Sequence, residues 1–421
     1  MSKTFSIKTL GCKLNQFESL RIVNSFLSHG WQQKSFGLET DLVIINTCTV
    51  TDKSDKKCRN YIRQGAKFSK DKGVVVTGCL VEAGRDNLKL MPEVLALIKN
   101  EQKESIYEKL QKQFNWPLFK NSFHPEEKFL LEKSRPPLKI QDGCNGKCSY
   151  CIIPKVRGKS VSRKVEEVID DAKKILDEGV KEIVLTGITI GNYSNSNYDL
   201  AGLIEKIINL NGNFRVRVSS LEPHHLTENF LNLFASEKMC QHLHLPLQSG
   251  SDKILVKMKR PYSKAGYKKI IEKTKKNNPE LALGTDIIVG FPGEEAQDFQ
   301  ETMDLISWAE FSYTHQFLFS PRSGTEAASL KQTATKEELK ERTQKLRSHS
   351  ATISMKYKQK FIGKTLISII EKKDNTYLGI ADNYLKIKLK NPERNFIFKN
   401  QLLPVEVLSL QEESLIGKVG L

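Results

Sequence analysis

The stretch CNGKCSYC, residues 144–151, places Cys144, Cys148 and Cys151 in a C-x3-C-x2-C array. The array directly follows a strand-like run, LKIQDG (138–143). Five more strand-like runs come after it, with helix-like stretches between them. This alternation predicts a partial (βα)6 barrel of parallel strands, in which functional residues gather at the carboxyl ends of the strands. The five runs are EIVLTGI (182–188), FRVRVSS (214–220), HLHLPLQ (242–248), ALGTDIIVG (282–290) and FSYTHQFLF (311–319).

The three closely spaced cysteines indicate an iron–sulfur site. Three thiolates bind three irons of a 4Fe–4S cluster and leave the fourth iron open to a small molecule. Zinc is the alternative, but zinc usually takes four protein ligands and a second cysteine or histidine pair nearby. No such pair follows within reach of the array. The spacing therefore favours a cluster with one open iron.

Residues 1–98 predict a smaller α/β domain with a parallel sheet, because short β-rich runs again alternate with helical composition. Three of these runs are each followed within two residues by a cysteine. Parallel strands bring their carboxyl ends to one edge of a sheet. The three cysteines can therefore form a second three-thiolate site, although packing of buried cysteines remains the alternative. The runs are TFSIKTL (4–10), DLVIINT (41–47) and GVVVTG (73–78), and the cysteines are Cys12, Cys48 and Cys79.

The rest of the chain divides by composition. Residues 99–135 are charged and irregular, and we expect them to be a connector that ends in SRPP. Residues 136–357 hold the predicted barrel and a polar helix at about 335–358. Residues 358–421 contain short strand-like runs and turns, which predict a small β-domain.

The composition favours a nucleic-acid partner. Lysine and arginine number 66 against 49 acidic residues, a formal net charge of +17. Such an excess favours association with a polyanion. No run approaches the roughly 18 apolar residues of a membrane span, and MSKTFSIKTLGCKLNQ lacks the features of a secretory signal. We therefore expect a cytoplasmic protein that does not bind membranes and whose cysteines are not paired as disulfides.

Several other residues are candidates by position. Thr186, Gly187, Glu222 and Gln248 lie at predicted carboxyl ends of strands, where ligands approach, although glycine and proline there can simply turn the chain. His242 and His244 alternate on a strand and face one side, and we expect hydrogen-bonded core histidines. Cys58 and Cys240 have no partner at ligand spacing, so we expect both to pack in the interior.

A phosphate-binding loop is not expected at Gly363, Lys364 and Thr365. Lys358 occupies the position where that loop requires glycine, and no strand-to-helix context surrounds it. Nucleotide hydrolysis is therefore excluded as a function.

Four motifs resemble the methylthiotransferase family of radical S-adenosylmethionine enzymes over nearly the whole chain. They are TLGCKLNQFES (9–19), NTCTVTDKSDKK (46–57), TGC (77–79) and CNGKCSYCIIPKVRG (144–158). The terminal β-domain resembles the TRAM module of that family, which is linked to RNA binding.

The resemblance implies two 4Fe–4S clusters and S-adenosylmethionine as cofactors, with no catalytic side chain beyond the cluster ligands. One cluster, on Cys144, Cys148 and Cys151, would generate the 5′-deoxyadenosyl radical. The other, on the three N-terminal cysteines, would carry the sulfur, and a second S-adenosylmethionine would supply the methyl group. Tyr150 would lie near the adenine of the cofactor, while Glu222 and Gln248 would hold its ribose or amino-acid part.

The implied substrate is the anticodon stem-loop of transfer RNA. The residues around Cys12 and Cys48 look most like the subgroup that acts on carbon 2 of N6-threonylcarbamoyladenosine at position 37. N6-isopentenyladenosine is the alternative substrate, and an RNA-binding protein with structural metal sites or a one-cluster radical enzyme are alternatives of other kinds. We also expect a monomer that takes electrons from a low-potential donor such as flavodoxin or ferredoxin.

Overall fold

The computed structural model describes residues 3–84, 88–116, 134–373, 376–390 and 400–420. Residues 117–133 of the expected connector lie outside this described part of the chain. The chain forms two compact units. The first unit comprises Met1–Leu131, Asp142–Gly146 and Cys151–Val161, and the second comprises Glu132–Gln141, Lys147–Tyr150 and Ser162–Leu421.

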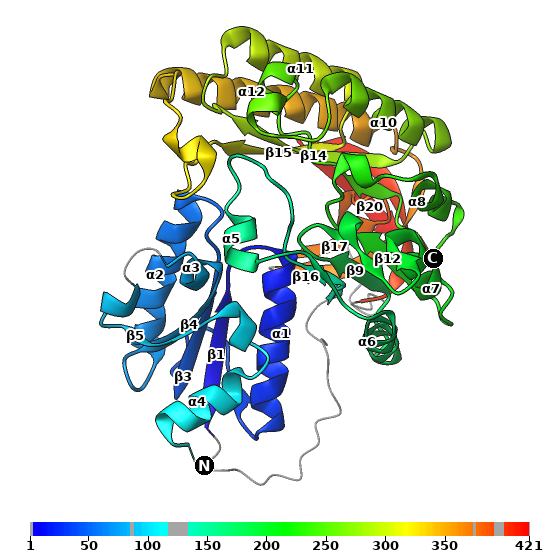
Figure 1. The fold of residues 1–421 in the computed structure, drawn as a ribbon. Helices are drawn as coiled ribbons and strands as arrows, with labels where there is room; N and C mark the ends of the chain where they lie inside the picture. Colours follow the sequence, from blue (N-terminus) through cyan, green and yellow to red (C-terminus); the bar gives the residue numbers. More distant parts are fainter. Residues whose placement is uncertain (1–2, 85–87, 117–133, 374–375, 391–399, 421) are drawn as a thin grey trace. The chain divides into compact units, whose positions relative to one another are not determined.

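The first unit is a five-stranded sheet with helices on both faces (Figure 1). All neighbouring strands are parallel in the order β2-β1-β3-β4-β5, which confirms the predicted parallel sheet. The strands are β1 (Thr4–Thr9), β2 (Gln32–Gln33), β3 (Leu42–Thr47), β4 (Val74–Gly78) and β5 (Val94–Ile98). The helices are α1 (Lys13–Ser28), α2 (Asp52–Phe68), α3 (Cys79–Glu82), α4 (Ile106–Phe114) and α5 (Ile153–Arg157).

Strand β3 shows why helices cover both faces of this sheet. All six of its residues are buried, and successive side chains point to opposite faces. Ile44 packs with Phe26 of α1 and Tyr107 of α4, whereas Ile45 packs with Ile62 of α2. A strand that is apolar on both sides needs cover on both sides, which is typical of parallel sheets.

The second unit contains the six expected parallel strands, arranged as two three-stranded sheets. One sheet has the order β12-β9-β6 and the other β13-β14-β15, and isolated bridges at Val216–Met239 and Ser220–His244 join them. Strand β13 is short and ends before Pro246, which has no N–H to donate to the ladder. The strands are β6 (Pro137–Lys139), β9 (Glu182–Thr186), β12 (Arg215–Val218), β13 (His242–His244), β14 (Ala282–Val289) and β15 (Tyr313–Leu318).

Helices alternate with these strands, as the sequence predicts (Figure 1). None of the helices in the described ranges is long and apolar enough to cross a membrane. The helices are α6 (Val165–Asp177), α7 (Leu200–Ile208), α8 (Glu228–Asn232), α9 (Asp252–Lys257), α10 (Lys264–Asn277), α11 (Ala296–Ala309) and α12 (Lys336–Gln359). Four short strands complete this part of the chain: β7 (Gln141–Asp142), β8 (Val161–Ser162), β10 (Ser194–Asn195) and β11 (Tyr198–Asp199).

The C-terminal segment is a closed five-stranded barrel in the order β16-β17-β18-β20-β19, which confirms the predicted small β-domain. Gly363, with a φ of +83°, turns the chain from α12 into β16. This order, helix before strand, is the reverse of a phosphate-binding loop. The strands are β16 (Thr365–Lys373), β17 (Thr376–Ala381), β18 (Lys386–Leu389), β19 (Leu402–Gln411) and β20 (Ser414–Val419).

A buried charge network ties this small barrel to β9 and β12. Glu182 is fully buried and accepts hydrogen bonds from Arg215 and Arg217 at 2.7 and 2.6 Å. Arg215 also donates to the backbone oxygens of Ile367 and Ile380, and Arg217 donates to those of Ala381 and Asp382. One carboxylate thus positions two guanidinium groups that bind the backbone of the C-terminal barrel. We call these residues, with Arg135 and Glu371, the Glu182 network.

Candidate metal centres and cofactor site

Cys12, Cys48 and Cys79 follow three adjacent strands of the first unit. Cys12 is the N-cap of α1 after β1, Cys48 follows the last residue of β3, and Cys79 begins α3 after β4. Because these strands are parallel neighbours, the cysteines lie at one edge of the sheet. Gly11, with a φ of +99°, allows the close approach, since a Cβ there would lie 2.8 Å from that of Cys48.

The environment of these thiols fits an anionic cluster. Burial raises the pKa of Cys79 to about 11, while the charges of Arg157 and Lys103 act in the opposite direction. Burial also raises the pKa of Cys48. Buried thiols resist losing a proton unless a metal or a cation compensates the charge. A cluster would supply the metal, and the two basic side chains supply the positive charge.

The two remaining cysteines are buried in the interior. Cys58 is a fully buried residue of α2, and its thiol donates to the backbone oxygen of Cys48 at 3.3 Å. Cys240 is 1% exposed and lies beside Arg217, and burial raises its pKa to about 12. Both placements agree with the packing role expected from the sequence.

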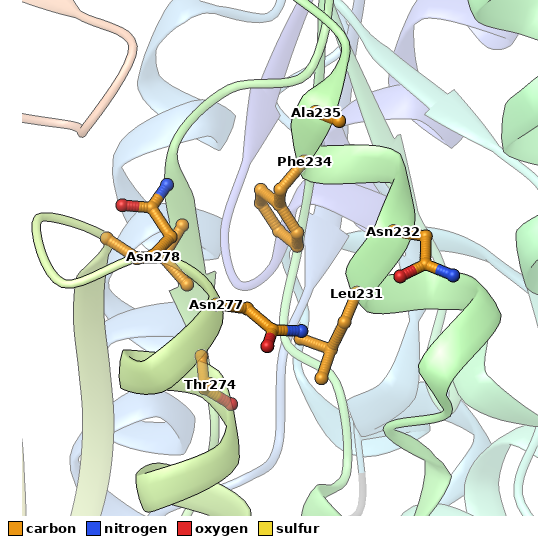
Figure 2. A pocket seen from close by; sticks show the side chains of 8 residues that line it. Leu231, Asn232, Phe234, Ala235, Thr274, Asn277 and Asn278 are labelled. Carbon is orange, nitrogen blue, oxygen red and sulfur yellow. The ribbon is translucent and has the colours of Figure 1, made fainter.

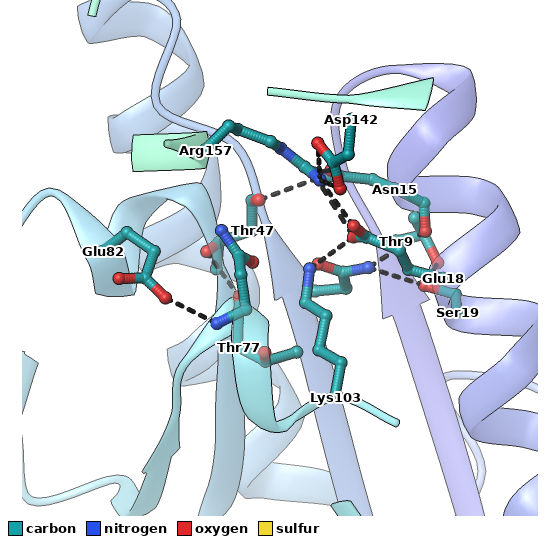
Figure 3. A network of polar contacts seen from close by, with 12 residues as sticks. Thr9, Asn15, Glu18, Ser19, Thr47, Thr77, Glu82, Lys103, Asp142 and Arg157 are labelled. Atoms are coloured by element: carbon teal, nitrogen blue, oxygen red, sulfur yellow. Dashed lines mark hydrogen bonds and ion pairs between the residues drawn. The ribbon is translucent and has the colours of Figure 1, made fainter. Parts of the chain in front are cut away.

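The basic side chains near Cys79 belong to a buried network shown in Figure 3. Glu18 accepts hydrogen bonds from both Lys103 and Arg157, and Arg157 also pairs with Asp142 at 3.3 Å. Asn15 accepts a hydrogen bond from Arg157. The amide of Asn15 donates to Leu10 O and Thr47 O, both at 2.8 Å, and so links the ends of β1 and β3. We call Asn15, Glu18, Lys103, Asp142 and Arg157 the Glu18 network.

We expect Glu18→Gln to destabilise the first unit by about 2–4 kcal/mol, because Lys103 and Arg157 would remain buried beside an uncharged amide. Burial alone would raise the pKa of Glu18, but Lys103 and Arg157 lower it from 4.5 to about 2. The contribution of Glu18 is therefore complete above pH 4.5 and disappears as the pH falls through 2. Urea unfolding followed by the fluorescence of Trp31 and Trp116 measures both effects. A wild-type stability that does not fall faster with acid than that of the variant would contradict this assignment.

The second cysteine set lies in the loop between β7 and α5. Arg260 donates from Nη1 to the sulfur of Cys148 at 3.3 Å, and the same guanidinium pairs with Glu222. Tyr262 stacks near the Arg260 guanidinium, and its hydroxyl donates to Pro246 O at 2.8 Å. A thiol, a carboxylate and a buried cation therefore meet at the carboxyl ends of β12 and β13. Such a group can bind the zwitterionic end of an amino acid.

The other predicted cofactor residues occupy different environments. Tyr150 packs edge-on against Phe291 with the ring centroids 6.4 Å apart. Gln248 has a φ of +70°, rare for a residue with a side chain, and such strain concentrates at functional sites. Thr186 is buried, and Gly187 approaches the backbone of Gln141 so closely that a Cβ would lie 2.8 Å from its oxygen. The packing of the strands thus accounts for the glycine.

Sequence reasoning did not identify Arg157, Lys103 or Arg260 as site residues. Arg157 lies six residues after Cys151, in the segment quoted for the family resemblance. A basic residue so close to the cysteine array could have been identified as a candidate site residue from the sequence. Lys103 and Arg260 are far along the chain from their partners, and only the folded structure brings them together.

A pocket of about 500 Å³ lies elsewhere in the second unit (Figure 2). It is bordered by α8 and α10 and by Leu281, which precedes the first residue of β14. This is the amino end of the strand, opposite to the end where barrel active sites form. The pocket contains no cysteine, and we assign it no role in the reaction.

Comparisons with known proteins agree with this geometry. Residues 138–306 match the Radical SAM superfamily, and residues 4–99 match Uncharacterized protein family UPF0004. The chain is 34% identical to "Threonylcarbamoyladenosine tRNA methylthiotransferase MtaB" of Chlamydia pneumoniae, over 99% of this chain and 98% of that protein. It is 31% identical to "tRNA-2-methylthio-N(6)-dimethylallyladenosine synthase" of Helicobacter pylori (strain P12), with 98% of each covered.

A solved structure shows the same fold. The radical S-adenosylmethionine methyltransferase TsrM from Kitasatospora setae matches 78% of this chain and 77% of its own, with a TM-score of 0.57 at 14% identity. The fold and the cysteine array thus define a radical S-adenosylmethionine enzyme, a class whose cofactors are S-adenosylmethionine and a 4Fe–4S cluster. With relatives above 30% identity over nearly its full length, the chain belongs to the radical S-adenosylmethionine methylthiotransferase family.

Proposed function

We propose that this chain methylthiolates carbon 2 of N6-threonylcarbamoyladenosine at position 37 of transfer RNA. The observation that carries the proposal is the set of three cysteines at the ends of β1, β3 and β4, in addition to the cysteine array of the second unit. One cluster is enough to generate a radical, and the family resemblance implies that a second cluster with an open iron carries the sulfur. The relatives named for the threonylcarbamoyl substrate and the net charge of +17 support the choice of RNA.

Two 4Fe–4S clusters are the proposed metal cofactors, one on Cys12, Cys48 and Cys79 and the other on the array at 144–151. When bound, the clusters and S-adenosylmethionine supply the radical, the methyl group and the sulfur. The protein contributes binding and charge. Arg157 and Lys103 offset negative charge beside Cys79, and the anticodon loop, already unpaired, presents its base at a low cost in unstacking.

Arg260 and Glu222 are the proposed binding groups for the amino-acid end of S-adenosylmethionine. The cofactor carries an ammonium group and a carboxylate, and these two side chains carry the complementary charges. Arg260 is only 3% exposed and is held by its contact with Cys148, which fixes the direction in which it donates. Gln248 and Tyr150 complete the proposed site, at the ribose and the adenine, respectively.

We expect Glu222→Gln to raise the dissociation constant for S-adenosylmethionine about tenfold, because an amide replaces a charge-assisted hydrogen bond to the ammonium group. Equilibrium dialysis with the reconstituted enzyme measures the constant. Glu228→Gln, on the exposed start of α8, is the matched control and should bind as the wild type does. Equal affinity in both variants would remove Glu222 from the cofactor site.

The function is tested with synthetic anticodon stem-loops that differ at position 37. They carry N6-threonylcarbamoyladenosine, N6-dimethylallyladenosine (the same nucleoside as N6-isopentenyladenosine) or plain adenosine. Reconstituted enzyme, S-adenosylmethionine and a low-potential reductant are added, and the nucleosides are identified by mass spectrometry. The proposal expects methylthiolation of the threonylcarbamoyl stem-loop. Methylthiolation of the dimethylallyl stem-loop instead would change the substrate and keep the reaction. Consumption of S-adenosylmethionine without methylthiolation of any stem-loop would reject the reaction.

A further inference from the structure

A polar cluster on β13, β14 and β15 has no part in the sites described above. It consists of His244, Asp286, Tyr313 and His315, and we call it the His315 cluster. Asp286 Oδ1 lies 3.1 Å from His244 Nε2 and 3.3 Å from His315 Nδ1. The Tyr313 hydroxyl lies 3.0 Å from His244 Nδ1. In the strand register Asp286 pairs with His315, so the two side chains share one face of the sheet.

This face is turned towards the space that the two three-stranded sheets enclose. Tyr384 contacts Tyr313 of β15 and His242 of β13, with ring centroids 5.9 and 4.9 Å apart. The same ring contacts Arg217 of β12, in the other sheet. Side chains from both sheets therefore converge on one aromatic ring. The side chain of His315 is 57% exposed and that of Asp286 is 23% exposed, so a ligand in this space can reach the cluster.

The His315 cluster also adjoins the residues proposed to bind the cofactor. The backbone N–H of Leu221, the residue before Glu222, donates to His244 O at 2.9 Å. The N–H of Gln248 donates to Asp286 O at 2.8 Å. A base whose carbon 2 reaches the cofactor would therefore present the neighbouring part of the same edge, with carbon 6, to the side chains of the second unit that adjoin the cofactor residues.

We propose that His315, oriented by Asp286, binds the threonylcarbamoyl group of the target adenosine and selects it over an apolar N6 substituent. The inference rests on the proposed function. Carbon 6 of adenine, which bears the substituent on N6, is separated from carbon 2 by N1 alone, so the substituent lies beside the reacting carbon and within reach of a cluster that adjoins the cofactor residues. Asp286 accepts the hydrogen bond from Nδ1–H of His315, which leaves Nε2 as an acceptor for the hydroxyl or an N–H of the threonylcarbamoyl group.

The chemistry of the cluster favours a polar occupant. Burial alone would raise the pKa of Asp286, but hydrogen bonds from the two histidines lower it to about 2, so the carboxylate stays ionised at neutral pH. A dimethylallyl group offers no hydrogen bond and would desolvate these polar groups without compensation. The cluster could also be read as a metal site, since its three potential ligand atoms lie within 4.8 Å of one another. However, the hydrogen bonds to Asp286 Oδ1 already account for this geometry.

The test compares wild type, His315→Phe and His315→Gln on the threonylcarbamoyl and dimethylallyl stem-loops. The readout is the ratio of the two kcat/KM values, because a general loss of folding or cofactor lowers both rates and leaves their ratio unchanged. We expect His315→Phe to reduce the preference for the threonylcarbamoyl substrate about 10- to 100-fold. His315→Gln keeps a hydrogen-bond acceptor, its amide oxygen, and should retain part of the preference. His349→Phe, on α12, where the ring contacts Ser307 and not the His315 cluster, is the matched control and should keep the wild-type ratio.

Three results would overturn the inference. In the first, His315→Phe has the same ratio of the two kcat/KM values as the wild type. In the second, the wild-type enzyme itself prefers the dimethylallyl stem-loop. The third is one non-cluster metal ion per chain that the wild type holds and His315→Phe loses, which would make the cluster a metal site. Failure of the proposed function is a separate result, because the wild type would then methylthiolate neither stem-loop.

Discussion

Replacing Cys12, Cys48 and Cys79 together by alanine should lower the iron content from about eight to about four atoms per chain after anaerobic reconstitution. Methylthiolation of transfer RNA should be lost, since the proposed sulfur-bearing cluster would have no ligands. Cleavage of S-adenosylmethionine to 5′-deoxyadenosine should persist, because the array at 144–151 is unchanged. Iron and acid-labile sulfide assays, together with chromatography of the nucleoside product, measure these three quantities.

Cys58→Ala and Cys240→Ala are the matched controls for that experiment, because both cysteines are buried and neither is a proposed ligand. Each should keep the wild-type iron content even if it lowers stability. If the triple variant kept the wild-type content, the three cysteines would not be ligands. Retained methylthiolation at half the iron would instead show that one cluster is sufficient.

Glu182→Gln should destabilise the second unit by about 3–5 kcal/mol, the usual cost of leaving buried charge uncompensated. Arg215 and Arg217 are 5% and 1% exposed, and each depends on this carboxylate for its closest ion pair. Without it, the guanidinium groups bind only backbone oxygens and lose their orientation towards β16 and β17. Urea unfolding followed by circular dichroism measures the loss.

Limited trypsin digestion adds a local measurement, because loosening of the C-terminal barrel should speed cleavage between α12 and β16. Glu237→Gln, at an exposed position of the same unit, is the control and should change stability by no more than about 0.5 kcal/mol. If the unfolding midpoint of Glu182→Gln equalled that of the control, the hydrogen bonds from the two arginines to the backbone would be enough to hold the C-terminal barrel without the carboxylate.

The sequence predicted most of the strands and the placement of the cysteines because both depend on local patterns, but it was wrong for α4 (Ile106–Phe114), which lies in the expected irregular connector and packs in the core of the first unit. Apolar runs such as DLVIINT gave β3, and the cysteine after it could be placed at the edge of the sheet from the parallel order alone. The partners of Glu18 and Glu182 could not be predicted in this way. Arg157 is 139 residues from Glu18 in the sequence, and no periodicity relates two charged residues at that separation.

The same limit applies to the His315 cluster. The alternation of His242 and His244 on one strand predicted a shared face and hydrogen-bonded histidines, and both do contact Tyr313. The third strand, β15, could be recognised from its apolar residues, but its register against Asp286 could not. Register follows from packing of the whole sheet, so only the structure shows which polar side chains become neighbours.

The first unit consists of three separate segments of the chain, so it can be completed only after the last of them has been synthesised. Residues 142–146 and 151–161 complete this unit, although they are translated after the sheet itself. Glu18 and Lys103 can pair on the nascent chain, but Arg157 and Asp142 join them only when the ribosome has passed residue 157. Arg157, the second cation near the three N-terminal thiols, therefore becomes available only after the loop with Cys144, Cys148 and Cys151 has been translated. If these thiols bind the proposed cluster, iron loading should follow translation of both segments.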